Sequence, residues 1–205
     1  MNGGHPLIDK PYSESCEQNR EPILAVLREV FADRSRLLEI GSGTGQHAVY
    51  FAAELPHLVW QTADVPPHHP GIRLWLDEAA LPNVLAPIAL DVSDTAWHAG
   101  RYDAVFSANT LHIMSWPEVE RFFAGVGAVM APGGVLVVYG PFNYNGAYTS
   151  DSNARFDAWL KQRDPASGVR DFEAVDALAQ SQGLVLQQDI AMPANNRSLV
   201  WQKMA

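Results

Sequence analysis

A glutamate followed by alternating glycines is the most chemically suggestive stretch of the chain, in the segment EIGSGTG at 39–45. The apolar residues 37–40 predict a short buried strand, and residues 47–55 predict a helix after the turn. Glycine allows positive φ and a close ligand approach, and the N–H groups at a helix start bind polar or anionic groups. The spacing differs from the Gly-x-Gly-x-x-Gly that cradles a pyrophosphate. Glu39 would repel a phosphate, so the segment predicts a ligand with a cationic amine. A plain strand–turn–helix connection is the alternative.

Two further acids end the strands that are predicted next. Residues 58–63 form a predicted strand that leads to Asp64, which lies 19 positions after Gly45. An acid at about 20 residues from such a turn meets ribose hydroxyls in dinucleotide sites. Residues 83–90 form the following predicted strand and lead to Asp91, whose carboxylate would accept a hydrogen bond from a ligand donor. The alternatives are a solvated loop aspartate for Asp64 and a helix N-cap for Asp91.

Other polar side chains are expected near the same edge. In a parallel sheet the carboxyl ends of the strands border the ligand crevice, so Asn109 and His112, which follow the predicted strand 102–107, are expected at its mouth. His112 is a candidate general base because the ordinary pKa of histidine is about 6.5; a packed histidine is the alternative. Asn19 and Arg20 lie on a predicted helix before the first strand and are expected over the ligand, or alternatively at a solvated helix end.

The composition is that of one globular domain. The chain has 205 residues, 47% of them hydrophobic, which suits a single α/β domain spanning 1–205. Its net charge of −9, without a Lys/Arg cluster, argues against a nucleic-acid partner. The sequence shows no apolar run of about 18 residues and no signal-like start, so neither a membrane partner nor secretion is expected. Cys16 is the single cysteine and favours a reducing, cytoplasmic location.

The order of predicted elements sets the fold class. Residues 1–12 are expected to be a loose arm, and a helix follows in which Pro22 ends one turn or opens the next. Strands and helices then alternate, which predicts a doubly wound, Rossmann-like α/β domain with a mostly parallel, seven-stranded sheet. The predicted strands 184–192 and 198–203 form a closing hairpin, so the C-terminal strand is expected to be antiparallel.

Two irregular segments interrupt the alternation. The segment 140–170 is long, polar and interspersed with aromatic residues, and a loop of this length is usually functional, structured or both. A helix is expected within it at 153–163. The segment 65–71 is rich in proline and contains His68 and His69, but no Cys, Asp or Glu completes a recognisable ligand set nearby. We therefore expect a surface loop there and no metal site.

The glycine turn resembles motif I of the class I methyltransferases that use S-adenosylmethionine, and the closing hairpin is similar to the end of their sheet. From residue 19 onward the chain most resembles the methyltransferase-like 26 family. The loop 65–69 departs from that family because it is less acidic. The narrowest similarities are NREPIL (19–24), GTGQHA (43–48), YGPF (139–142), SNARFD (152–157) and MPANN (192–196).

The resemblance implies S-adenosylmethionine as cofactor, S-adenosylhomocysteine as product and an unidentified small molecule as methyl acceptor. It implies that Glu39 lies near the methionine amino group, that the glycines pass beneath the methionine and ribose, and that Asp91 meets the adenine amino group. The expected cofactor-binding residues are Glu39, Gly41, Ser42, Gly43, Gly45, Asp64, Asp91, Val92 and Asn109.

The acceptor is expected under the segment 140–170, where amides and a phenol would orient a polar molecule by neutral hydrogen bonds. His112 or Tyr139 would remove a proton if the acceptor requires it. A purely structural use is the alternative for the last of these amides, since Asn tolerates positive φ in turns. The expected substrate-facing residues are Asn19, Arg20, Tyr139, Asn153 and Asn195.

Two other functions stay open at this point. One is a protein that binds S-adenosylmethionine without turnover. The other is a nicotinamide-dependent oxidoreductase, against which the Glu39 carboxylate and the closing hairpin argue.

Overall fold

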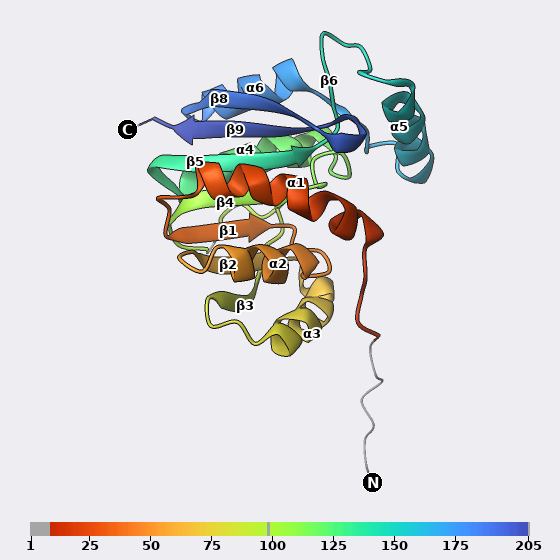
Figure 1. The fold of residues 1–205 in the computed structure, drawn as a ribbon. Coiled ribbons are helices and arrows are strands. Elements are labelled where there is room, and N and C mark those ends of the chain that lie inside the picture. Colours follow the sequence, from red (N-terminus) through yellow and green to blue (C-terminus); the bar gives the residue numbers. More distant parts are fainter. Residues whose placement is uncertain (1–8, 98, 205) are drawn as a thin grey trace.

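Seven strands form the central sheet of the computed structural model, which describes residues 9–97 and 99–204 (Figure 1). The strand order is β3-β2-β1-β4-β5-β9-β8. Neighbours from β3 to β5 pair in parallel, whereas β9 pairs antiparallel with β5 and β8. The predicted Rossmann-like α/β fold is confirmed. The strands are β1 (Arg36–Ile40), β2 (Val59–Asp64), β3 (Val84–Ala89), β4 (Tyr102–Ala108), β5 (Met130–Gly140), β8 (Leu184–Met192) and β9 (Asn196–Lys203).

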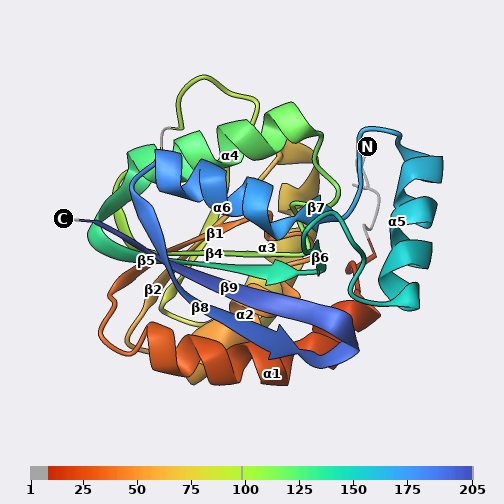
Figure 2. The same cartoon turned by 90° about the horizontal axis from the view of Figure 1, so that it is seen from above.

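Helices cover both faces of this sheet (Figure 2). One face carries α1 (Glu14–Val30) and α2 (Gln46–Glu54), and the other carries α4 (Trp116–Val129) and α6 (Phe172–Ser181). Beside α2 lies α3 (His69–Ala79). Each helix in the described parts of the chain is too short or too polar to span a bilayer.

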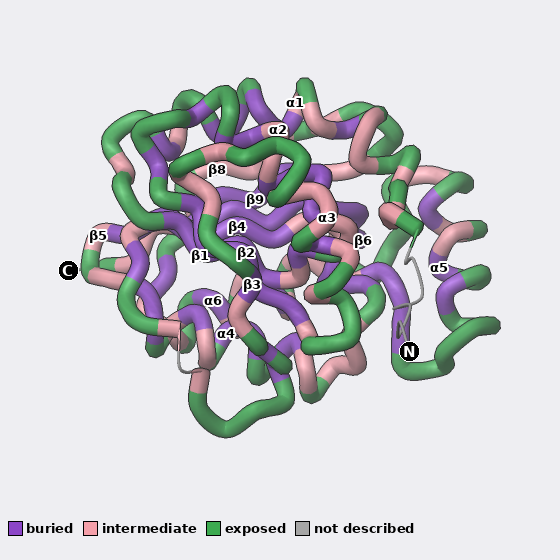
Figure 3. Tube along the Cα trace, turned by 90° about the horizontal axis from the view of Figure 1, so that it is seen from below, coloured by how far each residue is buried: buried purple, intermediate pink, exposed green. Residues whose placement is uncertain are grey.

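Side-chain alternation along the strands builds two apolar cores. In β1, Leu37 belongs to the cluster on the α1 and α2 face, and its neighbour Leu38 belongs to the cluster on the α4 and α6 face. Successive side chains of a strand point to opposite faces, so a strand covered on both sides is apolar throughout. Trp60 and Trp201 are fully buried, one in each cluster. In Figure 3 much of the trace of the central strands is buried.

The predicted interruption at Pro22 is wrong, because α1 runs unbroken through it. A proline inside a helix removes one backbone hydrogen bond and costs about 3 kcal/mol. The buried stripe of Ile23, Leu24 and Leu27 packs this helix on the sheet. We attribute the continuity of α1 to this tertiary packing, which outweighs the local cost.

Two helix starts also differ in how well the sequence predicted them. The start of α4 follows the sequence signal, because Ser115 and Glu118 form a reciprocal capping box. The segment 65–71 is predicted to be a surface loop, but it contains a short 3-10 helix (Pro66–His68). Helix α3 begins directly after this 3-10 helix. Proline is tolerated in the first turn of a helix, where its missing N–H has no partner to lose.

The segment 140–170 is structured. Its helix α5 (Asp151–Arg163) lies beyond the carboxyl ends of the parallel strands, at one side of the sheet (Figures 1 and 2). The unpredicted short strands β6 (Phe142–Asn143) and β7 (Arg170–Asp171) pair with each other. This pair brings the two ends of the segment together, so the segment forms a closed insertion.

A buried carboxylate holds this insertion together. Asp157 of α5 accepts hydrogen bonds from the backbone N–H of Val169 at 2.8 Å, from the Tyr148 hydroxyl at 2.7 Å and from Lys161 at 2.7 Å. Burial raises the pKa of Asp157, but these hydrogen bonds outweigh burial, and the pKa lies below its usual value. Asp157 therefore stays ionised and fixes α5 to the returning chain.

The predicted loose arm, 1–12, lies only partly within the described residues, because 1–8 fall outside them. Its described end contacts α3. Lys10 pairs with Glu78 at 2.7 Å, and the indole N–H of Trp75 donates to the Pro11 carbonyl at 2.7 Å. Residues 9–12 are therefore held against α3.

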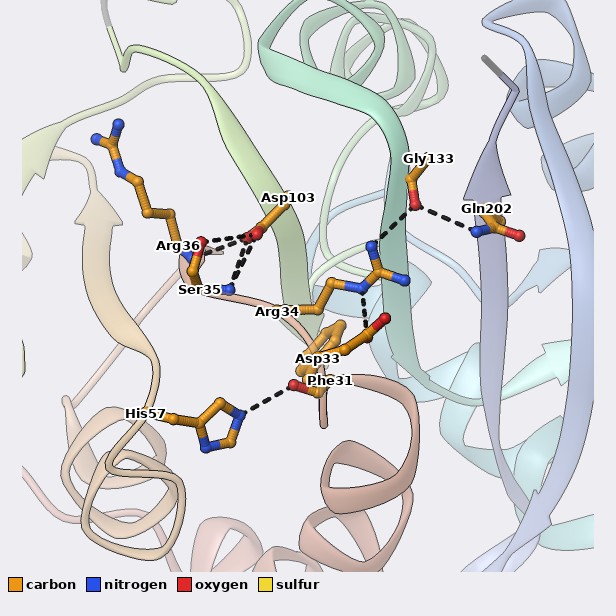
Figure 4. A network of polar contacts seen from close by, with 9 residues as sticks. All are labelled: Phe31, Asp33, Arg34, Ser35, Arg36, His57, Asp103, Gly133 and Gln202. Atoms are coloured by element: carbon orange, nitrogen blue, oxygen red, sulfur yellow. Dashed lines mark hydrogen bonds and ion pairs between the residues drawn. The ribbon is translucent and has the colours of Figure 1, made fainter.

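Polar contacts around the connection from α1 to β1 lie at the amino ends of the parallel strands, away from the glycine turn (Figure 4). Asp103 accepts hydrogen bonds from the backbone N–H of Ser35 at 2.9 Å, from the Ser35 hydroxyl at 2.8 Å and from the N–H of Arg36 at 2.8 Å. Arg34 and Gln202 both donate to the Gly133 carbonyl. These contacts link β1, β4 and β5 at their amino ends. The carboxyl ends of the strands carry the glycine turn and the loop after β4.

We predict that Asp103→Ala lowers the free energy of unfolding by about 1–3 kcal/mol, because two backbone N–H groups lose a charged acceptor. Urea denaturation followed by circular dichroism measures it. The matched control is Asp33→Ala, whose side chain is 77% exposed, and which should change stability by less than about 0.5 kcal/mol. Equal effects of the two variants would contradict this assignment.

Candidate functional site

The glycine turn after β1 has the backbone that its sequence demands. Gly41, Gly43 and Gly45 have φ of +74°, +56° and +91°. A Cβ on Gly41 would lie 2.6 Å from Thr110, and one on Gly45 would lie 3.2 Å from the backbone of Ile72. A Cβ on Gly43 would have only the Gly41 carbonyl within 4.0 Å. Packing thus accounts for two of the glycines, whereas the third leaves space open above the turn.

Glu39 is a buried carboxylate beneath this turn. One oxygen, Oε2, accepts hydrogen bonds from the Ser42 hydroxyl at 2.9 Å and from the Trp60 indole at 3.1 Å. No hydrogen bond among the described residues uses the other oxygen. Burial raises the pKa of Glu39 to about 7, and the two hydrogen bonds offset only part of that effect. A cation beside the carboxylate would compensate for its buried charge.

Asp64 clamps the turn from the end of β2. Its Oδ2 accepts from the Gly43 N–H at 2.7 Å, and its Oδ1 accepts from the Val65 N–H and lies 2.7 Å from Nδ1 of His68. The residue is 8% exposed, so the alternative of a solvated loop aspartate is wrong. His69 also contacts Asp64, through the backbone carbonyl at 2.9 Å. The segment 65–71, which is predicted to be a surface loop, thus holds the side chain and the backbone carbonyl of Asp64 in place.

A first cavity of about 380 Å³ opens above the turn. Six of the nine expected cofactor-binding residues line it, whereas Glu39, Ser42 and Gly45 do not. Apart from Val92, sequence reasoning missed the apolar walls, which come mainly from the loops after β2, β3 and β4. The lining residues are Ile40, Gly41, Gly43, Asp64, Val65, His68, Leu90, Asp91, Val92, Ala108, Asn109, Thr110, Ile113, Met114 and Glu118.

Asp91 stands at the rim of the first cavity. It is exposed, and its Oδ1 accepts a hydrogen bond from the Ser93 N–H at 2.8 Å. The alternative of a helix N-cap is wrong, because the residues that follow it form turns and no helix begins there. The side chain bonds the backbone two residues ahead, as Asp commonly does in turns.

A second cavity of about 490 Å³ lies beside the first, between α1, α5 and the closing hairpin. Asn19, Tyr139 and Asn153 line it, as expected of substrate-facing residues. Sequence reasoning missed most of the others, which are contributed by distant segments. The lining residues are Ser15, Gln18, Asn19, Pro22, Asn109, Tyr139, Pro141, Ser152, Asn153, Phe156, Pro193, Ala194 and Asn196.

Two expected substrate-facing residues do not line this cavity. Arg20 pairs with Glu17 at 2.7 Å and lies over the Tyr50 ring, 4.5 Å from its centroid. The backbone carbonyl of Asn195 accepts a hydrogen bond from the Asn153 side-chain amide at 3.1 Å. The side-chain amide of Asn195 donates to the Ser152 hydroxyl. Asn195 therefore connects the hairpin to α5, with φ of +59° as its turn requires.

Asn109 lines both cavities and marks their junction. It has φ of +58°, a conformation that is uncommon for residues other than glycine but that asparagine tolerates. Its N–H donates to the Tyr139 carbonyl at 2.9 Å. Strained residues often occur at functional sites, and this one is held where β4 leaves the sheet.

His112 is not at the mouth of either cavity, which corrects its expected position. It is buried, and its ring meets the edge of Phe156 at a centroid distance of 5.2 Å. Burial, reinforced by the positive charge of Arg170, lowers its pKa to about 4. The imidazole is therefore neutral at neutral pH.

Gln46, at the start of α2, connects α1 to the glycine turn. Its side-chain oxygen accepts from the Ser13 N–H and the Thr44 hydroxyl, and its nitrogen donates to the Ser13 carbonyl at 3.3 Å. The start of α1 is thereby held against the turn. This contact explains how residues of α1 come to line the second cavity.

Comparison with known proteins yields one family and many similar folds. The family described as a protein of unknown function (DUF938) matches residues 10–203. An O-methyltransferase family protein from Burkholderia thailandensis is 18% identical, with a TM-score of 0.80, and the match covers 90% of this chain and 56% of that one. The S-adenosylmethionine-dependent methyltransferase SibL is 20% identical, with a TM-score of 0.79 and coverage of 93% and 56%.

A third structure is an O-methyltransferase family 2 protein from Planctomyces limnophilus in complex with apigenin. It is 15% identical, with a TM-score of 0.81 and coverage of 93% and 58%. The chain thus spans less than two thirds of the length of each of these proteins. At such identities the likeness establishes the fold alone.

We predict that Glu39→Gln stabilises the protein without ligand more at pH 8 than at pH 5. The native pKa of about 7 lies above the ordinary 4.5, so the native state binds the proton more tightly than the unfolded state does. The stability that this proton contributes is complete below about pH 4.5 and is lost as the pH rises through about 7. Glutamine removes this loss and keeps an oxygen for Trp60.

Thermal unfolding of wild type and variant at both pH values measures the difference. The control is Glu29→Gln, at an exposed position of α1. If the wild type and Glu39→Gln differ equally at pH 5 and pH 8, the carboxylate is not the uncompensated group that its burial indicates.

Proposed function

This chain belongs to the family described as a protein of unknown function (DUF938), and we propose that it transfers the methyl group of S-adenosylmethionine to a small molecule. The observation that carries the proposal is the pair of cavities that meet at Asn109, one above the glycine turn and one beneath α5. The similar structures are described as O-methyltransferases or as a S-adenosylmethionine-dependent methyltransferase, which supports the proposal. The proposal includes a relationship to the methyltransferase-like 26 family, which is supported by sequence motifs alone.

The residues of the first cavity, together with Glu39 beneath the glycine turn, fit the cofactor chemically. The unused oxygen of Glu39 suits the cationic amino group of the methionine portion, and the open space above Gly43 suits a ligand that passes close to the backbone. Asp64 would accept from the ribose hydroxyls and Asp91 from the adenine amine. The apolar neighbours of Asp91, including Val92 and Ile113, would flank a flat base.

The mechanism asks little covalent chemistry of the protein. When bound, S-adenosylmethionine supplies an electrophilic methyl group on a positively charged sulfur. An acceptor oxygen or nitrogen would form a bond to the methyl carbon as the carbon–sulfur bond breaks toward sulfur, and the acceptor proton would pass to solvent or to a base. The protein aligns the reactants and excludes water. Asn109, which lines both cavities, would lie between the reactants, and α5 would cover the acceptor side.

Proton removal is the step for which the side chains are least suited. His112 is neutral and able to accept a proton, but its lowered pKa makes it a weak base. Burial raises the pKa of Tyr139, so its phenol stays protonated at neutral pH. Because the lowered pKa of His112 and the raised pKa of Tyr139 both make these side chains poor bases, an acceptor that loses its proton to water after methyl transfer fits the site better.

We predict that S-adenosylhomocysteine binds to the protein and that Asp64→Ala weakens this binding by about 10- to 100-fold. Hydrogen bonds to a charged group contribute about 1.5–3 kcal/mol, and each 1.4 kcal/mol is tenfold in affinity. Isothermal titration calorimetry measures it. Asp33→Ala is the control acid at the opposite edge, and thermal unfolding verifies that each variant is folded.

The same titrations separate the competing functions. Unchanged affinity in both Asp64→Ala and Glu39→Gln would contradict the proposed cofactor position. Preference for NAD over S-adenosylhomocysteine would favour a nicotinamide-dependent oxidoreductase. Donor binding without any methylated product across a panel of small metabolites would favour a binding protein without turnover.

A further inference from the structure

The second cavity differs from the first in its charge. The thirteen described residues that border it include no Asp, Glu, Lys, Arg or His. Three acids, Asp64, Asp91 and Glu118, border the first cavity. An ionised group that enters a site without a counter-charge loses hydration and gains no compensating partner. The second cavity therefore selects against charged ligands.

Neighbouring amides act on the one ionisable group in this lining, the Tyr139 phenol. Oδ1 of Asn19 lies 2.7 Å from Nε2 of His47, which is buried in α2. Burial lowers the pKa of His47 to about 4, so its ring is neutral, and it must carry its proton on Nε2 because an amide oxygen only accepts. The amide nitrogen of Asn19 is thereby the group left to donate, and Asn19 lowers the pKa of the Tyr139 hydroxyl, as a donor does.

Tyr139 interacts with a second amide, that of Asn196 from the closing hairpin. The Asn196 nitrogen also donates to the Pro193 carbonyl at 3.2 Å, which holds the amide within the closing hairpin. Burial raises the pKa of Tyr139, whereas Asn196 and Asn19 lower it, as donors to its oxygen do, so the phenol keeps its own proton for a ligand in the cavity that all three residues line. The phenol is a hydrogen-bond donor in this cavity.

The remaining lining combines polar residues with an apolar surface of one aromatic ring and three prolines. Phe156 of α5 is half-buried, with its ring stacked on Trp159 at 5.8 Å. Pro22, Pro141 and Pro193 complete this surface. Aromatic and proline side chains lose little conformational freedom on binding, and they suit a flat ring.

Resting on the proposed function, we infer that the methyl acceptor is an uncharged molecule with a flat ring and an oxygen or nitrogen that accepts a hydrogen bond from Tyr139. Asn19 and His47 are positioning residues for that hydroxyl.

The test uses ring probes that differ only in charge: benzamide and benzyl alcohol as neutral probes, benzoate as the anion and benzylamine as the cation. Saturation-transfer NMR at millimolar probe concentrations compares their binding to the full chain, with and without S-adenosylhomocysteine. The neutral probes are expected to bind and the ionised probes to be excluded. Tyr139→Phe should weaken benzamide binding by about tenfold, the loss of one hydrogen bond of about 1.4 kcal/mol.

Two pairs of variants separate orientation from structure. His47→Phe keeps an aromatic ring for the stacking on Phe51 but removes the hydrogen bond, whereas His47→Gln keeps a donor. Benzamide binding should fall in the first and be retained in the second. Gln18→Glu places a carboxylate at the exposed rim and should admit benzylamine, whereas Gln18→Asn should not.

Binding of benzoate or benzylamine to the wild type as strong as that of benzamide would overturn the inference, as would benzamide binding that Tyr139→Phe leaves unchanged or that is undetectable in the wild type. The proposed function has its own readout. If S-adenosylhomocysteine does not bind but the neutral probes bind selectively, the proposed methyltransferase function is contradicted and the predicted selectivity of the second cavity is retained. Tight S-adenosylhomocysteine binding with unselective probes would remove this inference alone.

Discussion

The reversal of strand order at β1 is the constraint on which the site depends. β2 and β3 lie to one side of β1, and β4 and β5 lie to the other. The helix after β1 packs on one face of the sheet, and the helix after β4 packs on the opposite face. Because the two connections diverge, the carboxyl ends of β1 and β4 stay open between them. The glycine turn and Asn109 stand at this opening, and both cavities begin there.

The electrostatics of the site favour neutral side chains. Burial lowers the pKa of His47 and His112 to about 4 and raises that of Glu39 to about 7. It also raises the pKa of Tyr139, and amide donors offset this only in part. The environment therefore leaves Glu39 as an acid that a bound cation would stabilise, whereas the described lining of the second cavity consists of uncharged side chains.

The wall of the second cavity depends on contacts that join distant parts of the chain. Asn153 of α5 donates to the carbonyl of Asn195, and Tyr144 donates to Asp189 of β8 at 2.8 Å. Arg197 of β9 pairs with the same Asp189 at 2.7 Å. The insertion and the closing hairpin thus support each other. This mutual support makes the insertion an ordered wall of the cavity.

Local sequence patterns determined the fold class, the glycine turn and the acids at the strand ends, because strand period, glycine at positive φ and strand–turn–helix order act over a few residues. They also determined the capping box of α4. They did not determine that α1 continues through Pro22 or that His112 is buried away from the cavities, since packing against the sheet decides both. Asn19 and Asn196 meet at Tyr139 only because sheet register and helix packing bring together residues at opposite ends of the chain. Strand ends and turns are local properties, whereas a cavity wall is assembled from long-range contacts that only the tertiary structure supplies.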